Sequence, residues 1–267
     1  MTKYSLGTDD PEIKRLEVQA TWLEGPTRML LRAAGIVPGM RVLDLGCGLG
    51  HVSFLAAELA GPEGRVVGLD SSARLLEIAA SRASSFPQVR FVEGNVRTWR
   101  GDEPFDAIVG RLILFHLPDV QAVLKHQLAG LRRGGLVVGL DFDVGAARAD
   151  PQVPVVAENT ARLIAAFKSA GADPTIGVRL ARILSDAGVT DVKSFGYQDY
   201  FGPTDPRGPA MLTAVVQSLA PLMAKAGIAT PEQLGLDTLR ERIAVAMRDA
   251  GSIFLPPVLV GAWGKLP

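Results

Sequence analysis

The fold is decided by residues 42–50, which read Val42-Leu43-Asp44-Leu45-Gly46-Cys47-Gly48-Leu49-Gly50. An apolar run ends in three glycines at alternate positions, and a stretch with helical spacing follows. Glycine permits a tight turn and lets the backbone approach a ligand closely, because it carries no side chain. The pattern therefore predicts a strand, a ligand-binding loop and a helix in succession.

The spacing of the glycines indicates which ligand the loop binds. A dinucleotide-binding loop has the pattern G-x-G-x-x-G and presents backbone N–H groups to a pyrophosphate. Here the third glycine, Gly50, comes one place early, and His51 occupies the dinucleotide position. Asp44 would face a diphosphate unfavourably, whereas its carboxylate suits an ammonium or sulfonium group. The loop therefore favours S-adenosylmethionine (SAM) over NAD.

Short strands alternate with helical stretches from residue 40 to residue 143. The predicted strands are apolar on both sides and bounded by Gly, Pro or Asp, as is typical of parallel strands covered by helices on both faces. The strands are Arg41–Leu45, Arg65–Leu69, Val89–Val92, Phe105–Val109 and Leu136–Phe142, and the helices between them are Val52–Ala60, Arg74–Ala83 and Val120–Leu131. Repeated units of this kind predict a doubly wound α/β sheet.

Asp70 ends the second predicted strand, 24 residues after Gly46 (70 − 46). An acid at this place can accept hydrogen bonds from both hydroxyl groups of a ribose. Dinucleotide-binding folds share this feature, so Asp70 indicates a nucleoside without choosing which one. Alternatively, Asp70 caps the helix that follows Ser71 and Ser72.

The segments outside this region have a different pattern. Residues 12–34 have helical spacing that is interrupted at Gly25-Pro26. After residue 143 we expect helices and two strands, at Val155–Ala170, Val178–Ala187, Val189–Tyr197 (strand), Gly208–Ala226, Pro231–Ala250 and Ser252–Trp263 (strand). The predicted domains are an N-terminal helical cover (1–35), a SAM-binding domain (36–200 and 252–267) and a helical insertion or lid over the substrate site (201–251). The apolar residues of 211–223 fit either a lid over an apolar substrate or a packed or dimer-forming helix.

Five motifs, VLDLGCGLG, VVGLD, FVEGNV, FDAIVGRLILFHLPD and LRRGGLVVGLDFD, occur in the order and spacing of the class I SAM-dependent methyltransferases. The chain most resembles the small-molecule branch that includes the ubiquinone/menaquinone methyltransferase-type enzymes. The resemblance covers about residues 36–143 and weakens to general architecture beyond them. It implies a Rossmann-like, mostly parallel sheet of seven strands with an antiparallel final strand, here residues 252–263, to which the helices predicted between the sixth and last strands add a helical cap or insertion.

The resemblance implies roles for residues of the first motif. Gly46, Cys47, Gly48 and Gly50 would form the loop around the methionine part of SAM. Asp44 would lie near the ammonium group of that methionine. Nothing marks Cys47 as a nucleophile, and a small residue fits between the glycines.

The resemblance implies further roles for residues of the later motifs. Asp70 would bind the ribose hydroxyls, with Ser71 beside it. The family usually has an acid that accepts a hydrogen bond from the adenine amine where this chain has Asn95, whose carbonyl can accept the same bond. Val96 would supply an adjacent backbone N–H, and Arg111 would lie by the methionine moiety.

His116 follows the fourth predicted strand and is the candidate catalytic residue. Its imidazole could deprotonate a hydroxyl, a phenol or an activated carbon. Alternatively, it packs in the turn, since methyl transfer needs chiefly the alignment of donor and acceptor. Tyr4 either shields SAM or packs in the core. Tyr197, Tyr200 and Phe201 could line the acceptor pocket, while His51 and His126 are assigned to helix or surface roles.

Composition excludes several classes of function. The 267 residues contain 28 Lys plus Arg and 28 Asp plus Glu, and no basic run is present, which argues against a nucleic-acid partner. One cysteine and three histidines argue against a metal site. No apolar run is long enough to span a bilayer, so we expect a cytoplasmic protein with no membrane partner.

We therefore expect an enzyme that transfers the methyl group of SAM to an O, N or C atom of a small, apolar or aromatic molecule. A homodimer is compatible with the apolar helix at residues 211–223. The alternative is a SAM-binding enzyme of the same fold that catalyses a cyclisation or rearrangement without methyl transfer. This alternative is motivated by the lack of a clear general base.

Overall fold

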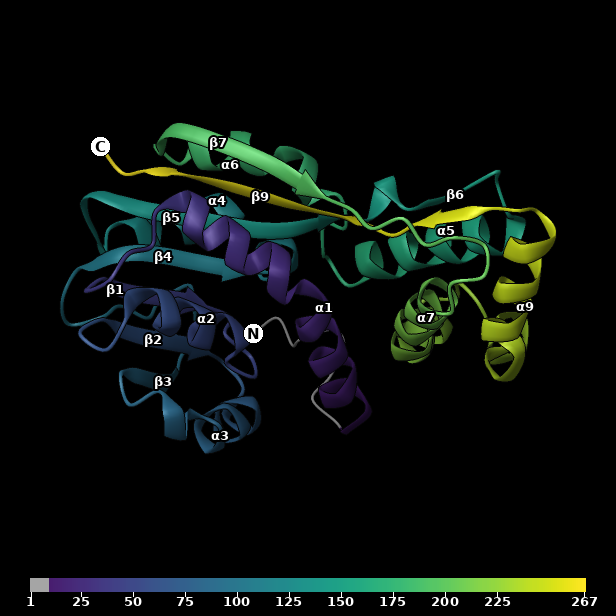
Figure 1. Cartoon of the computed structure of the whole chain (residues 1–267), viewed down its shortest axis with the longest axis horizontal. Coiled ribbons are helices and arrows are strands. Elements are labelled where there is room, and N and C mark those ends of the chain that lie inside the picture. Colours follow the sequence, from purple (N-terminus) through teal and green to yellow (C-terminus); the bar gives the residue numbers. More distant parts are fainter. Residues whose placement is uncertain (1–9) are drawn as a thin grey trace.

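The computed structural model describes residues 10–267 and contains a seven-stranded sheet (Figure 1). The strand order is β3-β2-β1-β4-β5-β9-β7. The bounds are β1 (Arg41–Leu45), β2 (Arg65–Asp70), β3 (Val89–Glu93), β4 (Phe105–Arg111), β5 (Leu131–Asp143), β7 (Thr190–Tyr197) and β9 (Val258–Lys265). Strands β1–β5 pair in parallel, and β9 runs antiparallel to both of its neighbours. The predicted mostly parallel α/β sheet with an antiparallel final strand is confirmed.

Helices cover both faces of this sheet, and each face has its own apolar core. Helices α1 (Asp10–Ala34) and α2 (His51–Ala60) cover one face, α4 (Val120–Leu128) and α6 (Leu180–Asp186) cover the other, and α3 (Ala73–Ser81) contacts β2 and β3. Successive side chains of a strand point to opposite faces. In β1, Val42 accordingly packs in the core under α1 and α2, and Leu43 packs in the core under α4 and α6.

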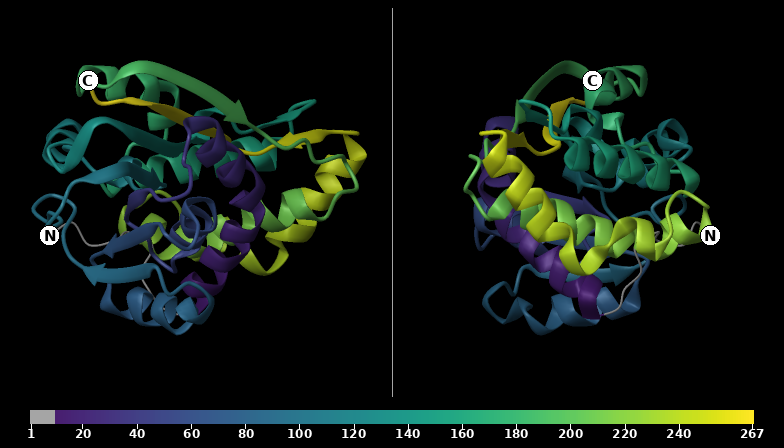
Figure 2. Two further views of the ribbon diagram at one scale, coloured as in Figure 1. Left: turned by 60° about the vertical axis from the view of Figure 1, so that its left-hand side comes forward. Right: turned by 90° about the vertical axis from the view of Figure 1, so that its right-hand side faces the viewer.

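A helical unit with its own apolar core lies beside the sheet (Figure 2). It comprises α5 (Pro154–Ser169), α7 (Arg207–Lys225), α8 (Pro231–Leu234), α9 (Leu236–Asp249) and a two-stranded antiparallel sheet of β6 (Arg148–Asp150) and β8 (Ile253–Leu255). Its core includes Val156, Leu163, Phe167, Phe201, Val216, Leu219, Met223, Ile243, Met247 and Phe254. The sequence placed α5 and β8 in the SAM-binding domain, whereas both pack in this second core.

Three predicted elements differ from the structure. Helix α1 runs without a break through Gly25-Pro26, because Leu23 and Leu30 are fully buried and this packing outweighs the backbone hydrogen bond that a proline removes. The predicted helix at 231–250 is two helices, since Gly235 adopts a left-handed conformation with φ of 53°. The predicted strand at 252–263 is divided by Pro256-Pro257 into β8 and β9, which belong to different sheets.

None of the helices in the described part of the chain is long and apolar enough to cross a membrane. The same residues hold no group of three or more His, Cys, Asp or Glu side chains that could bind a metal ion.

Candidate functional site

A cavity of about 1640 Å³ lies between the carboxyl edge of the sheet and the helical unit. The loops after β1, β2, β3, β4 and β5 form one end, and residues of α1, α5 and α7 complete the walls. Ligand pockets of proteins usually measure about 300–1,000 Å³. The cavity therefore has room for a nucleoside-sized ligand and a second molecule together.

The three glycines after β1 have different structural roles, and only one of them leaves open space at the cavity wall. Gly46, Gly48 and Gly50 have φ angles of 64°, 53° and 81°, which glycine adopts without the cost that a side chain adds. A Cβ at Gly46 would lie 2.8 Å from Ile113, and one at Gly50 would lie 2.7 Å from Phe91. A Cβ at Gly48 would meet no atom within 4 Å. Only Gly48 among these three thus combines a place on the cavity wall with open space in front of it.

Asp70 lines the cavity next to Ser71, and its carboxylate is held by backbone N–H groups of Gly48, Ser71 and Ser72. Oδ2 accepts a hydrogen bond from the Gly48 N–H (2.9 Å), and Oδ1 accepts one from the Ser72 N–H (2.9 Å). Burial raises the pKa of Asp70, and these hydrogen bonds oppose the shift. A carboxylate has about four lone-pair sites, so Asp70 keeps capacity to accept a hydrogen bond from a ligand. Asp70 therefore joins the glycine loop to the start of α3 and also faces the cavity.

Asn95 and Val96 line the cavity after β3. The Asn95 Oδ1 accepts a hydrogen bond from the Arg97 backbone N–H (2.9 Å). This bond orients the amide, because a backbone N–H requires an acceptor. The Nδ2 group and the second lone pair of Oδ1 are therefore the parts of Asn95 that a ligand can use. The predicted hydrogen bond from an adenine amine can form only with that second lone pair.

Arg111 ends β4 and carries a partly buried positive charge on the cavity wall. Its Nη1 donates a hydrogen bond to the Thr27 hydroxyl (3.0 Å), and Arg111 forms no ion pair with any residue that the structure describes. Burial lowers the pKa of Arg111 to about 10, and the nearby Asp44 carboxylate partly offsets this effect. The guanidinium thus stays charged at neutral pH. A charge withdrawn from water favours a partner of opposite charge, and an anionic group of a ligand fits this place.

The structure does not bring Asp44 to the cavity wall, where the resemblance placed it. Asp44 shares the α2 face of β1 with Val42, and it is 1% exposed. Its Oδ2 accepts a hydrogen bond from the Ser53 hydroxyl of α2 (2.6 Å), and its Oδ1 has no partner. Burial raises the pKa of Asp44 to about 7, although Ser53 and Arg111 oppose the shift. Asp44 therefore lies outside the lining of the cavity, and its negative charge stabilises the charged form of Arg111.

His116 lines the cavity in a turn that Asp141 of β5 holds in place. The buried Asp141 carboxyl accepts hydrogen bonds from the backbone N–H groups of Leu114 (3.1 Å) and Phe115. Burial raises the pKa of Asp141 well above its ordinary range. Leu112, at the start of the turn, has a φ of 56°, which a residue with a side chain adopts only at a cost. The turn is thus tightly constrained, and so is the position of the imidazole.

Burial lowers the pKa of His116 to about 4, and the charge of Arg15 adds to this shift. An unfolded histidine titrates near pH 6.5. Between this pH and about pH 4, His116 is therefore protonated in the unfolded chain and neutral in the folded chain. The stability associated with neutral His116 is therefore complete above pH 6.5 and is lost as the pH falls towards 4. Between pH 7 and pH 5, we expect the wild type to lose about 2 kcal/mol more free energy of unfolding than His116→Asn. Urea unfolding at both pH values measures this difference, and equal losses would contradict the assignment.

The far end of the cavity is lined mainly by apolar side chains of the helical unit. Phe115 and Phe167 pack edge to face there, with ring centroids 5.5 Å apart. The other apolar lining residues at this end include Leu163, Phe201, Met211, Leu212, Val215 and Phe254. This end suits a molecule with an apolar body.

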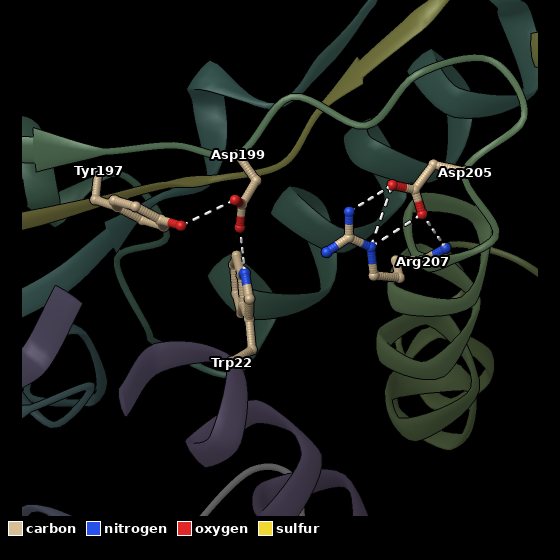
Figure 3. A network of polar contacts seen from close by, with 5 residues as sticks. All are labelled: Trp22, Tyr197, Asp199, Asp205 and Arg207. Atoms are coloured by element: carbon tan, nitrogen blue, oxygen red, sulfur yellow. Dashed lines mark hydrogen bonds and ion pairs between the residues drawn. The ribbon is translucent and has the colours of Figure 1, made fainter. Parts of the chain in front are cut away.

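A polar network connects α1 to the segment between β7 and α7 (Figure 3). Asp199 accepts hydrogen bonds from the Trp22 indole N–H and from the Tyr197 hydroxyl (2.9 Å to the latter). Arg207, the first residue of α7, pairs with Asp205 (2.6 Å). Trp22 and Arg207 both line the cavity, and the Trp22–Asp199 hydrogen bond joins α1 to this segment, which is distant in sequence.

Most of the predicted site residues line this one cavity. They are Gly46, Cys47, Gly48, Asp70, Ser71, Asn95, Val96, Arg111 and His116. Gly50 packs against Phe91, Asp44 bonds to Ser53, and Tyr4 lies outside the described residues. Burial raises the pKa of Cys47 far above its ordinary value, so its thiol stays protonated.

Several cavity residues differ from the sequence interpretation. Phe201 lines the cavity, whereas Tyr197 belongs to the network above and Tyr200 is 68% exposed. His51 begins α2 and also lines the cavity, and burial lowers its pKa. Its place directly after the glycine loop was the signal that could have identified it. Thr160 gave no such signal, because its place in the cavity depends on how α5 packs.

Comparisons with known proteins agree with this geometry. Residues 36–175, just over half of the chain, match the family model described as "Methyltransferase domain". The trans-aconitate 2-methyltransferase of Azoarcus sp. (strain BH72) is 36% identical over 110 residues, which are 41% of this chain and 42% of that protein. The 2-phytyl-1,4-naphtoquinone methyltransferase of Synechococcus elongatus is 34% identical over 123 residues, which are 43% of this chain and 51% of that protein. The matched region thus spans about half the length of these relatives.

A solved structure extends the similarity to the fold of nearly the whole chain. The YcgJ protein from Bacillus subtilis superposes with a TM-score of 0.58 at 17% identity, covering 90% of this chain and 97% of that one. At this identity the similarity concerns the fold alone, and it includes the mostly parallel seven-stranded sheet. On the family match, the chain belongs to the methyltransferase-domain family.

Proposed function

We propose that this protein is a SAM-dependent methyltransferase that acts on a small molecule with an apolar or aromatic body. The proposal rests above all on the cavity, which has polar loops of the sheet at one end and apolar helices at the other. The relatives reported above are named as methyltransferases of trans-aconitate and of a phytylnaphthoquinone. These names support a small-molecule acceptor without deciding its chemistry.

The polar end of the cavity is the proposed cofactor site. Asp70 would accept hydrogen bonds from the ribose hydroxyls, and the Val96 N–H and Asn95 amide would contact the adenine. Gly48 would lie against the methionine part, and Arg111 would pair with the methionine carboxylate. SAM bound in this way supplies a methyl group on a sulfonium sulfur, which any nucleophilic acceptor atom can attack.

The apolar end is the proposed acceptor site. The helical unit, in which residues 201–251 pack with α5, would form the wall and lid over the acceptor and exclude water. His116 would accept a hydrogen bond or the proton of the acceptor, because its lowered pKa keeps the imidazole neutral. A base with so low a pKa contributes modestly, so alignment of the two molecules would supply most of the rate enhancement. A cytoplasmic location, a homodimer and the lack of a nucleic-acid partner stay predictions from the sequence.

Two measurements test this function. Isothermal titration is expected to show saturable binding of S-adenosylhomocysteine, and its failure would remove the basis for a SAM site. A panel of phenols, quinols and aromatic amines is then incubated with SAM that carries tritium in its methyl group. Label that moves into an organic product supports methyl transfer. A new product without label supports cyclisation or rearrangement, the alternative that follows from the weak base.

A further inference from the structure

Thr160 is a buried polar residue in the apolar end of the cavity. It lies in α5, three residues before Leu163, and both residues line the cavity. Only 7% of Thr160 is exposed. Its hydroxyl is buried and has no hydrogen-bond partner among the described residues. A buried hydroxyl without a partner is unfavourable, so this position requires an explanation.

A ligand can provide the missing partner. Thr in a helix populates two χ1 rotamers, which point the hydroxyl in different directions. Rotation about this single bond redirects the hydroxyl without any movement of α5, and because Thr160 lines the cavity we expect one rotamer to face a bound ligand. Thr213 of α7 also has a buried hydroxyl without a partner and is 5% exposed. Thr213 does not line the cavity. Comparing variants of Thr160 and Thr213 therefore distinguishes the effect of losing a buried hydroxyl from the effect of losing a hydroxyl at the cavity wall.

The surroundings of Thr160 determine what kind of group it can bind. The cavity residues contributed by α5 are Thr160, Leu163 and Phe167, none of which is charged. Arg207 is the charged lining residue of α7, and it already pairs with Asp205. Among the residues that α5 and α7 contribute, no charge is therefore left to pair with a charged ligand group beside Thr160, and burying an unpaired charge is costly. A neutral hydroxyl or carbonyl group would form one hydrogen bond there.

We infer that the acceptor is a largely apolar molecule carrying a neutral hydroxyl or carbonyl group, and that Thr160 binds this group. Thr160 is then a specificity-determining residue, which orients the acceptor within the apolar end of the cavity. A site built to hydrogen-bond a ligand group rejects the analogue that lacks it, since its own polar group is then left unpaired. This inference rests on the proposed function, because the ligand is called an acceptor only if the protein transfers a methyl group. The preference of Thr160 for a ligand with a neutral polar group does not depend on methyl transfer.

The test uses two probes of similar shape, 2-naphthol and 2-methylnaphthalene, which differ in the presence of the hydroxyl. Their dissociation constants are measured with the wild type and with Thr160→Val, which replaces the hydroxyl by a methyl group. The ratio of the two constants within one protein cancels effects common to both probes. We expect Thr160→Val to reduce the preference for 2-naphthol about tenfold, the value of one hydrogen bond. The affinity for 2-methylnaphthalene should be unchanged.

Two control variants complete the design. Thr213→Val removes the matched buried hydroxyl outside the cavity and should keep the wild-type preference, and Thr160→Ser should restore it. An unchanged preference in Thr160→Val overturns the role of Thr160, and failure of both probes to bind the wild type overturns the assigned acceptor class. Each titration is run with and without S-adenosylhomocysteine. Loss of S-adenosylhomocysteine binding alone would count against the proposed function while leaving the probe preference intact.

Discussion

Replacing Asp70 with alanine is expected to lower the affinity for SAM at least 100-fold. Hydrogen bonds to a charged group contribute about 1.5–3 kcal/mol each, and two bonds to the ribose would be lost. The same change frees the N–H groups of Gly48 and Ser72, which Asp70 now holds, so the glycine loop would also lose a fixed point. Isothermal titration of S-adenosylhomocysteine into the wild type and the variant measures the effect.

Asp143 provides a matched control for this experiment. It also ends a strand of the same sheet, and its Oδ1 accepts a hydrogen bond from the backbone N–H of Gly145, two residues on, at 3.0 Å. Asp143 does not line the cavity. Asp143→Ala should therefore lose a similar local turn and keep its affinity for S-adenosylhomocysteine. Equal affinities for the two variants would contradict the proposed ribose site, provided that both remain folded by circular dichroism.

Replacing Asp141 with alanine is expected to lower the free energy of unfolding by about 2–4 kcal/mol, since buried N–H groups left without an acceptor cost about 1–3 kcal/mol each. The groups affected are the N–H groups of Leu114 and Phe115. The turn that carries His116 would be released as well, so methyl transfer should fall further than the affinity for S-adenosylhomocysteine. Urea unfolding and single-turnover kinetics measure the two effects separately.

Asp141→Asn is the control, because an amide oxygen can accept the same hydrogen bonds without a titrating group. The raised pKa of Asp141 in the folded protein means that the folded state keeps a proton that the unfolded state loses above its ordinary pKa. The wild type should therefore lose stability relative to Asp141→Asn as the pH rises. If Asp141→Asn destabilises the protein as much as Asp141→Ala at neutral pH, acceptance of the Leu114 and Phe115 hydrogen bonds is not what holds the turn.

Sequence patterns predicted the main sheet well because its determinants are local. Runs of apolar residues bounded by glycine or aspartate identified β1 to β5, and the motifs at Asp70 and Asn95 identified residues that do line the cavity. The pairing of β6 with β8 was missed, since β6 has three residues and a strand of that length carries no periodic signal, while β8 was predicted as one strand with β9. The break at Gly235 was also missed, because a single glycine can occur inside a helix.

The acceptor end could not be predicted because it is made by packing. Thr160 and Phe167 belong to α5, while Phe254 belongs to β8, and no spacing relates these positions in the sequence. For residues that the motifs did identify, the direction of the side chain decides whether the residue lines the cavity. Asp44 lies in the motif as expected, but the alternation along β1 turns it towards Ser53 and away from the cavity.

The position of β9 inside the sheet has a consequence for how the chain folds. Among the described strands, β7 pairs with β9 and with no other strand, so residues 190–197 emerge from the ribosome 68 residues (258 − 190) ahead of their partner. Until residues 258–265 follow, β5 and β7 present open edges that invite aggregation. Pairings this distant in sequence form slowly. Closure of the sheet is thus a late step, and it must follow the synthesis of the whole helical unit.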